Sequence, residues 1–409
     1  MKYYEELFNP FFLHKDKFHK KNYNIKSIDT ILKSLNKKID SIKKIKNKVI
    51  FKQKKIKNFQ DVKSNLINSK FVPNNIRKKM QNINHMYSYI FNIKKGNDTI
   101  EINVNFLLHK QENTSKYNVY IKKIIFLMNF LLSYSNNNTK SFSLYLYLSN
   151  FKKVLPNNEL IVLNPNNCNT GVTYACAING ECLIYREEEW FKVLIHETMH
   201  AFCLDFSISN YNTLKNKIKK IFPIKSDFQI SETYSETWAM IIKNVFISYE
   251  LNEKDRYHYF YSLMQLEIYF SMFQMMKILN FMNIYKYEYL YIPSKKPERN
   301  IYKEDTNIFA YYILKTISIY NYIDFLHFCK KNNNNLLNFN KKSKMGNNIY
   351  TKYYHFFKTH YNNSDFLLSC KKMELFYNKL YSKNKNSKNK NGKNKNVLLD
   401  TMRMSSIEY

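Results

Sequence analysis

Near the start of the chain, hydrophobic residues recur alternately four and three positions apart. In residues 25–50 these positions are Ile28, Leu32, Leu35, Ile39 and Ile42. The spacing places the five side chains on one face of a helix whose other face is basic. We expect this helix to pack on the body of the protein, although a basic amphipathic helix can also bind nucleic acid, a membrane surface or a partner helix.

From residue 86 onwards the hydrophobic positions alternate, which is typical of strands. Residues 86–104 predict a β-hairpin that turns at 95–98, and residues 142–149 predict another strand. Asn179 and Gly180 lie between two β-rich runs, and this dipeptide predicts a second hairpin.

Helical patterns accompany these strands and then replace them. Residues 117–135 predict a largely buried helix, and another helix is expected after the glutamates at 187–189, because acidic residues are favourable at a helix N-terminus. The second half predicts helices at 230–249, 257–283, 306–329 and about 351–380. We interpret their aromatic and methionine stripes as core.

The end of the chain changes character. Residues 383–396 contain only lysine, asparagine, serine and glycine, and we expect them to be disordered. The last residues, 397–409, could dock on the body or remain free. The expected organisation is a basic helical extension (1–80), a β-sheet lobe (81–206), a helical lobe (207–380) and a basic tail (381–409), and the fold class is α+β.

Composition narrows the classes of function. The 409 residues include only 5 glycines, and no glycine-rich phosphate-binding pattern occurs, which argues against a nucleotide-binding loop. The formal net charge of +33 would attract nucleic acid, anionic membranes or acidic proteins. A composition dominated by lysine, asparagine, isoleucine and tyrosine explains the same charge as solvated surface.

Targeting signals are expected to be absent. The N-terminus lacks the apolar core of a signal peptide, and no run of 18 apolar residues predicts a transmembrane helix. The 6 cysteines form no CxxC pair, so we expect reduced thiols in a cytosol-like compartment and no cysteine-based zinc site. The expected location is cytoplasmic and not secreted.

Candidate chemistry lies in residues 194–202, "LIHETMHAF". His196 and His200 are one helical turn apart and can present both imidazoles to a single ion. Glu197 lies about 100° around the helix from His196, within reach of a water on that ion. Zinc hydrolases use this HExxH pattern, with two histidine ligands and a glutamate as general base. Two ordinary core histidines are the simpler alternative.

A catalytic zinc needs a third protein ligand. Glu232 and Glu236 lie one turn apart in "QISETYSETWAMI" (229–241), beside apolar residues. Carboxylates on an apolar helix face are costly unless they are paired or bind a metal. We expect Glu232 to be the third ligand and Glu236 to accept a hydrogen bond from a ligand imidazole. The alternative is a solvated face or a salt bridge to lysine.

Together these two segments resemble the gluzincin branch of the zincin metallopeptidases. The resemblance covers residues 86–240 and implies a zincin-like lobe carrying HExxH, followed by an all-helical lobe. It assigns one Zn²⁺ per chain to His196, His200 and Glu232, with Glu197 as the general base. The run "REEEWFKVLIHETMHAF" with "ETYSETWA" also looks similar to uncharacterised proteins of large nucleocytoplasmic DNA viruses, which implies a location in host cytoplasm or virion.

The resemblance also implies how a substrate is held. Gluzincins bind the substrate backbone to an edge strand that precedes the HExxH helix. "CNTGVTY" (168–174) is placed like that strand, which makes Asn169, Thr170, Gly171 and Val172 candidate substrate-binding residues. A tyrosine or histidine of the helical lobe stabilises the oxyanion in this family, and the candidates are Tyr311, Tyr312 and His258.

The expected function is therefore hydrolysis of peptide bonds in a polypeptide substrate, with Glu197 activating a zinc-bound water. The alternative is a basic virion or nucleic-acid-binding protein built on a catalytically inactive zincin scaffold. The basic helix at 25–50 and the basic tail would bind nucleic acid or an acidic partner, with an affinity that falls as salt rises.

Overall fold

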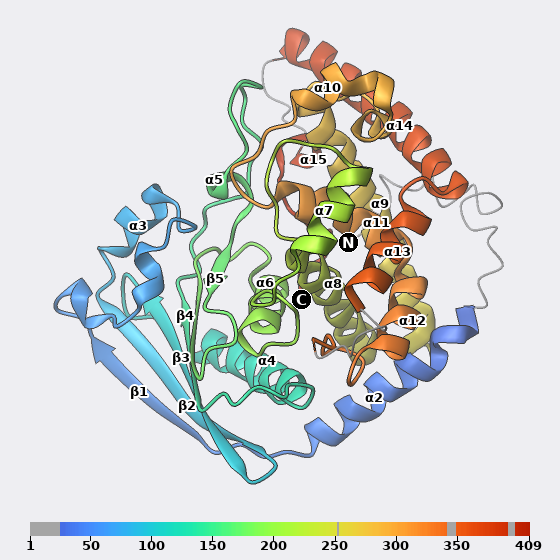
Figure 1. Cartoon of the computed structure of the whole chain (residues 1–409). Coiled ribbons are helices and arrows are strands. Elements are labelled where there is room, and N and C mark those ends of the chain that lie inside the picture. Colours follow the sequence, from blue (N-terminus) through green and yellow to red (C-terminus); the bar gives the residue numbers. More distant parts are fainter. Residues whose placement is uncertain (1–24, 252, 342–348, 392–396) are drawn as a thin grey trace.

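A computed structural model describes residues 25–251, 253–341, 349–391 and 397–409. The β-sheet and the helices that cover it lie on one side of the molecule, and the helices of the second half lie on the other (Figure 1). The fold class is α+β, as expected. None of the described helices is long and apolar enough to cross a membrane.

The sheet has six strands in the order β1-β2-β3-β4-β6-β5. They are β1 (Val49–Lys55), β2 (His85–Lys95), β3 (Asp98–Leu108), β4 (Ser141–Leu146), β5 (Gly171–Thr173) and β6 (Asn179–Ile184). β3, β4 and β6 run parallel, whereas β1, β2 and β5 each pair antiparallel with a neighbour. The short strand β5 is therefore an antiparallel edge.

Both predicted hairpins exist, but only the first turns where its sequence indicates. β2 and β3 meet at Lys95 and Asp98, and Gly96 has a φ of 62°, which glycine adopts without strain. The second hairpin was predicted to turn at Asn179-Gly180, and this was wrong. Both residues belong to β6, and residues 174–178 make the turn.

Each face of the sheet is covered by a different layer. α4 (Ser115–Leu132) and α6 (Trp190–Ala201) pack on one face, in the main core. α3 (Asn74–Met80) and the 3₁₀ helix η3 (Asn65–Asn68) contribute to a smaller cluster on the other face, with Leu107, Tyr145 and Leu183. The side chains of alternate strand residues supply the two clusters.

The basic segment at the start of the described chain is only partly helical. α2 (Asp29–Lys43) buries Leu32, Leu35 and Ile39, so the predicted packing of its apolar face is confirmed. The helix ends at Lys43, and β1 follows within the range expected to be helical. Every residue of β1 is exposed, so its side chains do not alternate between a buried and an exposed face, and the sequence lacks the usual pattern of a strand. Backbone pairing with β2 forms it instead.

The main helices of the helical lobe are α7 (Asn212–Ile221), α8 (Ile230–Leu251), α9 (Arg256–Phe281), α10 (Lys296–Asn300), α11 (Lys315–Tyr320), α12 (Tyr322–Asn332), α13 (Ile349–His360) and α14 (Ser364–Asn391). The helices predicted at 230–249 and 257–283 are confirmed as α8 and α9, whereas the ranges 306–329 and 351–380 each contain more than one helix, and α7 and α10 were not predicted. A π-helical stretch, Phe309–Leu314, precedes α11. Because α14 extends to Asn391, much of the segment expected to be disordered is helical, and 392–396 lie outside the described residues.

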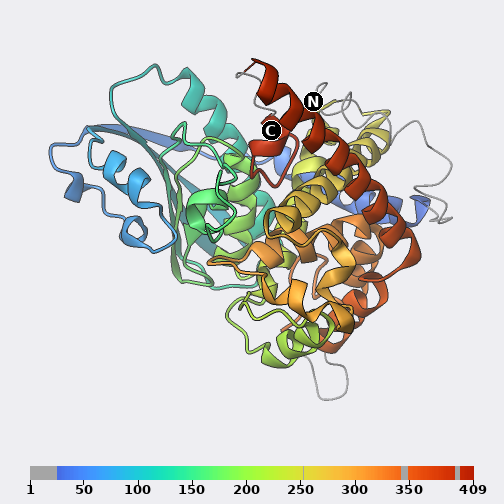
Figure 2. The same cartoon turned by 90° about the horizontal axis from the view of Figure 1, so that it is seen from above.

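Residues 397–409, here called the C-terminal segment, dock between the two lobes (Figure 2). The segment begins with α15 (Val397–Asp400) and buries Leu398, Met402, Met404 and Ser405. It reaches the sheet lobe through Met402 N–H, which donates to the carbonyl of Lys153 at 2.9 Å. Of the two fates left open by the sequence, docking is the one observed.

Three fully buried lysines of the helical lobe hold this segment. Lys243 donates to the carbonyl of Ile407 at 3.1 Å, Lys277 to that of Leu398 at 3.0 Å, and Lys315 to that of Met404 at 3.2 Å. Only Lys243 also forms an ion pair in the described chain, with Glu267 at 2.6 Å. Carbonyls of the C-terminal segment therefore satisfy buried ammonium groups that would otherwise be costly.

The buried lysines make stability depend on pH. Burial lowers the pKa of Lys277 to about 7 and that of Lys315 to about 8. Both values lie below the usual lysine pKa, so the unfolded chain binds more protons than the folded chain between pH 7 and 10. The free energy of unfolding therefore rises with pH in this window, by up to about 1.4 kcal/mol per pH unit for each lysine.

We predict that Lys277→Met reduces this pH dependence. Urea unfolding at pH 7 and pH 9 should show a smaller gain in stability for the variant than for the unsubstituted protein. Lys54→Met, at an exposed position of β1, should keep the full gain. Equal gains in the Lys277 variant and the unsubstituted protein would contradict the account.

Candidate metal centre

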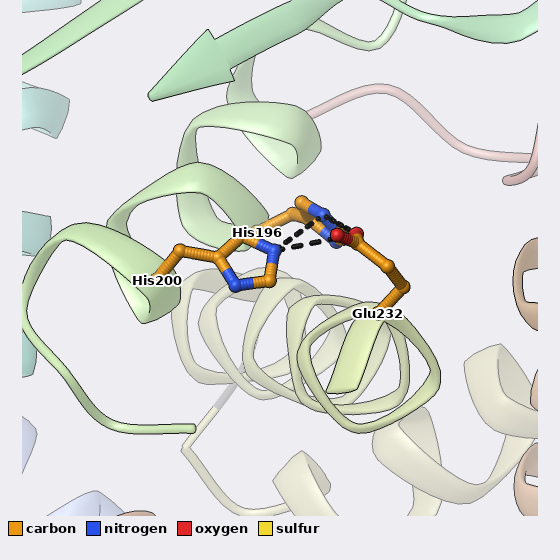
Figure 3. Close-up of side chains that lie close together, drawn as sticks. All are labelled: His196, His200 and Glu232. Atoms are coloured by element: carbon orange, nitrogen blue, oxygen red, sulfur yellow. Dashed lines mark hydrogen bonds and ion pairs between the residues drawn. The ribbon is translucent and has the colours of Figure 1, made fainter. Parts of the chain in front are cut away.

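The HExxH residues lie on a helix that is buried on all sides. α6 packs against β5, β6, α4 and α8, and all of its residues from Trp190 to Ala201 are buried. Polar side chains on such a helix need partners inside the protein. His196 and His200 find theirs on the side that faces α8 (Figure 3).

α8 supplies the acidic partners. It begins at Ile230, so Glu232 lies in its first turn and Glu236 one turn later, on the same face. The three candidate ligands His196, His200 and Glu232 come together as the sequence predicts.

The three candidate ligand atoms converge, at spacings slightly shorter than those expected around a tetrahedral zinc ion. His196 Nε2 lies 3.0 Å from Glu232 Oε2 and 3.1 Å from His200 Nε2, and His200 Nε2 lies 3.3 Å from Glu232 Oε2 (Figure 3). Ligands at about 2.0–2.2 Å from a tetrahedral zinc lie roughly 3.3–3.5 Å from one another. The three observed distances are therefore up to about 0.5 Å shorter than those expected around a bound zinc ion.

The far sides of both imidazoles are held by carboxylates. His196 Nδ1 lies 3.0 Å from Glu236 Oε2, and His200 Nδ1 lies 2.5 Å from Asp205 Oδ2. If each Nδ1 donates its proton to its carboxylate, both Nε2 atoms are acceptors that point at a third acceptor, Glu232 Oε2. Three converging lone pairs are unfavourable without a cation between them, so the residues fit a divalent metal ion.

The electrostatic environment agrees with this arrangement. Burial lowers the pKa of His200, but Asp205 and Glu232 outweigh that effect and raise the pKa well above its ordinary value. Burial raises the pKa of Glu232, but the two imidazoles outweigh it and lower that pKa. The strong negative potential that favours a proton on the histidines would equally favour a dication.

Glu197 lies beside these ligands and pairs with none of them in the described structure. It is 8% exposed, and burial raises its pKa above the ordinary glutamate value while the two imidazoles lower it. A raised pKa brings a carboxylate closer to the range in which a general base works. Glu197 therefore has the position and the environment of a proton acceptor.

A pocket opens next to Glu197 and His196. Its other lining residues are Lys153, Cys168, Asn169, Thr170, Gly171, Lys192, Val193, Glu236, Tyr311 and Met404. Three of the four candidate substrate-binding residues thus lie at this pocket. Val172 instead packs against the cluster on the opposite face of the sheet, as strand alternation requires. Substrate binding itself stays a prediction.

Gly171 is needed for a reason that the sequence did not reveal. A Cβ at this position would lie 3.0 Å from the side chains of Glu197 and Val193 and 2.7 Å from Ile184. The glycine therefore permits close packing of β5 on α6.

Of the candidate oxyanion donors, only Tyr311 lies at the site. Its hydroxyl donates to Glu232 Oε2 at 3.2 Å, and its ring is 6.0 Å from that of His196. The neighbouring Tyr312 points away and donates to the carbonyl of Met402 at 2.6 Å. His258 is exposed near the start of α9 and does not line the pocket. Tyr312 and His258 are thus wrong as candidates.

Sequence reasoning missed Asp205 and Lys192. Asp205 is fully buried and is held by Ser207 and Ser235 as well as by His200. Lys192 is buried and forms an ion pair with Glu236. A weak signal existed for both, since Lys192 precedes His196 by one helical turn and Asp205 is the single acid in the apolar run after His200.

The expectation of reduced cysteines is wrong for one pair. Cys176, in the β5–β6 turn, forms a disulfide with Cys203, just after α6. The backbone N–H groups of both cysteines donate to the carbonyl of His200, at 3.1 and 3.0 Å. The turn is thus fixed to the end of the HExxH helix, which explains why the hairpin does not turn at Asn179-Gly180. Cys168, Cys182, Cys329 and Cys370 are free and buried.

Comparisons with known protein-family models, with curated proteins and with solved structures give no match for this chain. The geometry of the site is therefore the basis for any functional conclusion.

We predict that Asp205→Asn weakens zinc binding about 10–100-fold, because the amide holds the His200 ring less firmly and lowers its basicity. Competition with a chromophoric chelator measures this affinity. Asp227→Asn is the matched control, because Asp227 is exposed and its ion pairs in the described part of the chain are with Lys215 and Lys219 of α7, not with a ligand. An unchanged affinity in the Asp205 variant would show that this carboxylate does not support a ligand.

Proposed function

We propose that the chain is a zinc-dependent metallopeptidase that hydrolyses peptide bonds. The observation that carries the proposal is the convergence of His196, His200 and Glu232 beside an unpaired Glu197, at a pocket bordered by an edge strand. The ligand set, two imidazoles and one carboxylate, is a common one for catalytic zinc, which keeps one position open. The gluzincin resemblance of the sequence points the same way.

The bound zinc would supply Lewis-acid chemistry, polarising the scissile carbonyl and acidifying water. Glu197 takes a proton from the attacking water as its oxygen bonds to the carbonyl carbon. The same carboxyl then gives that proton to the amide nitrogen while the C–N bond breaks. Glu197 is thus unchanged at the end, and the products are a carboxylic acid and an amine, which become a carboxylate and an ammonium group when the acid gives its proton to the amine.

Two further elements suit a polypeptide substrate. Among the described strands β5 pairs with β6 alone and ends the sheet, and an extended peptide can add to such an edge by backbone hydrogen bonds. Tyr311 can donate its hydroxyl to the developing oxyanion, since this group already reaches the ligand oxygen of Glu232.

Glu197→Gln tests the proposed chemistry. We expect peptide cleavage to fall about 10²–10⁴-fold, because glutamine cannot accept the proton, while zinc per chain stays unchanged. Glu187→Gln is the control, since Glu187 is partly exposed and pairs with Lys116 away from the site. Full activity in the Glu197 variant would refute the mechanism.

Tyr311→Phe should lower kcat by about 10²–10³-fold with little change in zinc content, because a donor to the oxyanion is lost. Tyr312→Phe removes a hydroxyl from the adjacent residue, whose partner is the carbonyl of Met402, and should leave kcat nearly unchanged. Equal kcat values for the two variants would exclude Tyr311 as the donor.

The alternative, a nucleic-acid-binding protein on an inactive scaffold, is favoured by one feature. Residues 43–57 contain 8 lysines and no acidic residue, and β1 within them is exposed throughout. If this alternative holds, the unsubstituted protein cleaves no peptide. Peptide cleavage that is present in the unsubstituted protein and lost in Glu197→Gln would therefore favour the peptidase over the nucleic-acid-binding protein.

A further inference from the structure

The C-terminal segment reaches the pocket beside Glu197 through a single side chain, that of Met404. This residue is 4% exposed and is fixed on several sides. Its N–H lies 3.1 Å from both carboxylate oxygens of Glu189, its carbonyl accepts from Lys315 at 3.2 Å, and its sulfur lies 3.7 Å from Lys192 Nζ. Met404 is therefore a rigid part of the pocket wall.

The anchors of Met404 lie on both lobes. Glu189 precedes α6 and forms an ion pair with Lys153 at 2.7 Å, and both side chains are buried. Lys315 belongs to the helical lobe and also donates to Ser271 at 2.9 Å. The position of the methionine thus depends on the segment being docked between the lobes.

Apart from Glu197, which the proposed mechanism uses as the proton acceptor, the charged side chains that line the pocket are already paired. Lys153 pairs with Glu189, and Lys192 pairs with Glu236. A charged substrate side chain would be buried here without a counter-ion of its own, which is unfavourable. An uncharged side chain avoids this cost, and Met404 and Val193 offer it apolar contact.

We infer that the C-terminal segment is part of the substrate-binding site, and that Met404 makes the pocket select a small uncharged side chain next to the bond that is cleaved. This inference rests on the proposed peptidase function. It assigns to the last residues of the chain a role in specificity, in addition to their role in joining the lobes.

The test compares Met404→Ala with Met402→Ala in the full-length protein. Met402 belongs to the same segment and is fully buried, but it does not line the pocket. Each variant is given a peptide library, and mass spectrometry identifies the cleaved bonds. Retention of the same library by each variant in a Glu197→Gln background provides a second readout that needs no turnover.

We expect Met404→Ala to shift the preference toward larger side chains by at least about 10-fold, because the truncation enlarges the pocket. Met402→Ala should change it less than about 2-fold, and Met404→Leu should retain the original preference. In the unsubstituted protein, peptides with aspartate at that position should be cleaved and retained at least about 10-fold less well than those with asparagine, which has nearly the same shape and no charge.

An unchanged preference in Met404→Ala, or the same shift in both alanine variants, would overturn the inference while leaving the peptidase function in place. A preference for charged side chains would overturn it as well. Failure of the unsubstituted, zinc-loaded protein to cleave any peptide would instead refute the proposed function, together with the inference that rests on it.

Discussion

The packing of α6 against α8 is the interaction on which the rest of the site depends. It places Glu197, Glu232 and Glu236 around two imidazoles in a mostly buried volume, and Asp205 joins them from the loop after α6. Lys192 pairs directly with one of these four acidic side chains, Glu236. Burial of so much unmatched negative charge is costly. A divalent cation bound by His196, His200 and Glu232 would remove much of that cost, so the packing that builds the site would also favour binding of a metal.

A complementary constraint governs the interface between the lobes. Lys243, Lys277 and Lys315 are fully buried, and the polar groups that the C-terminal segment brings satisfy their ammonium groups. The segment returns to the sheet lobe at Lys153 and Glu189, next to the start of α6. The candidate metal site is therefore linked to the interface between the lobes: Met404 contacts Glu189 and Lys192, and Lys192 pairs with Glu236 beside His196.

The local parts of this architecture could be predicted from the sequence. His196, Glu197 and His200 lie within one helix and Glu232 and Glu236 within another, so their shared faces follow from helical spacing. Contacts between distant residues could not be predicted in this way. Lys192 and Met404 are 212 positions apart, and nothing local indicates that they meet. Strand β1 could not be predicted for a related reason. It is exposed along its length and is held by backbone pairing with β2, which leaves no hydrophobic pattern in its sequence.

The second hairpin shows how tertiary contacts override a local signal. Asn179-Gly180 favours a tight turn. The observed turn instead comprises the five residues 174–178, and the disulfide between Cys176 and Cys203 holds it beside α6.

The central claim, a zinc site made by His196, His200 and Glu232, is tested most directly by elemental analysis of the purified protein and of His200→Ala. The account predicts about one zinc per unsubstituted chain and little in the folded variant. A folded, unsubstituted protein that holds no zinc after incubation with the metal would contradict it.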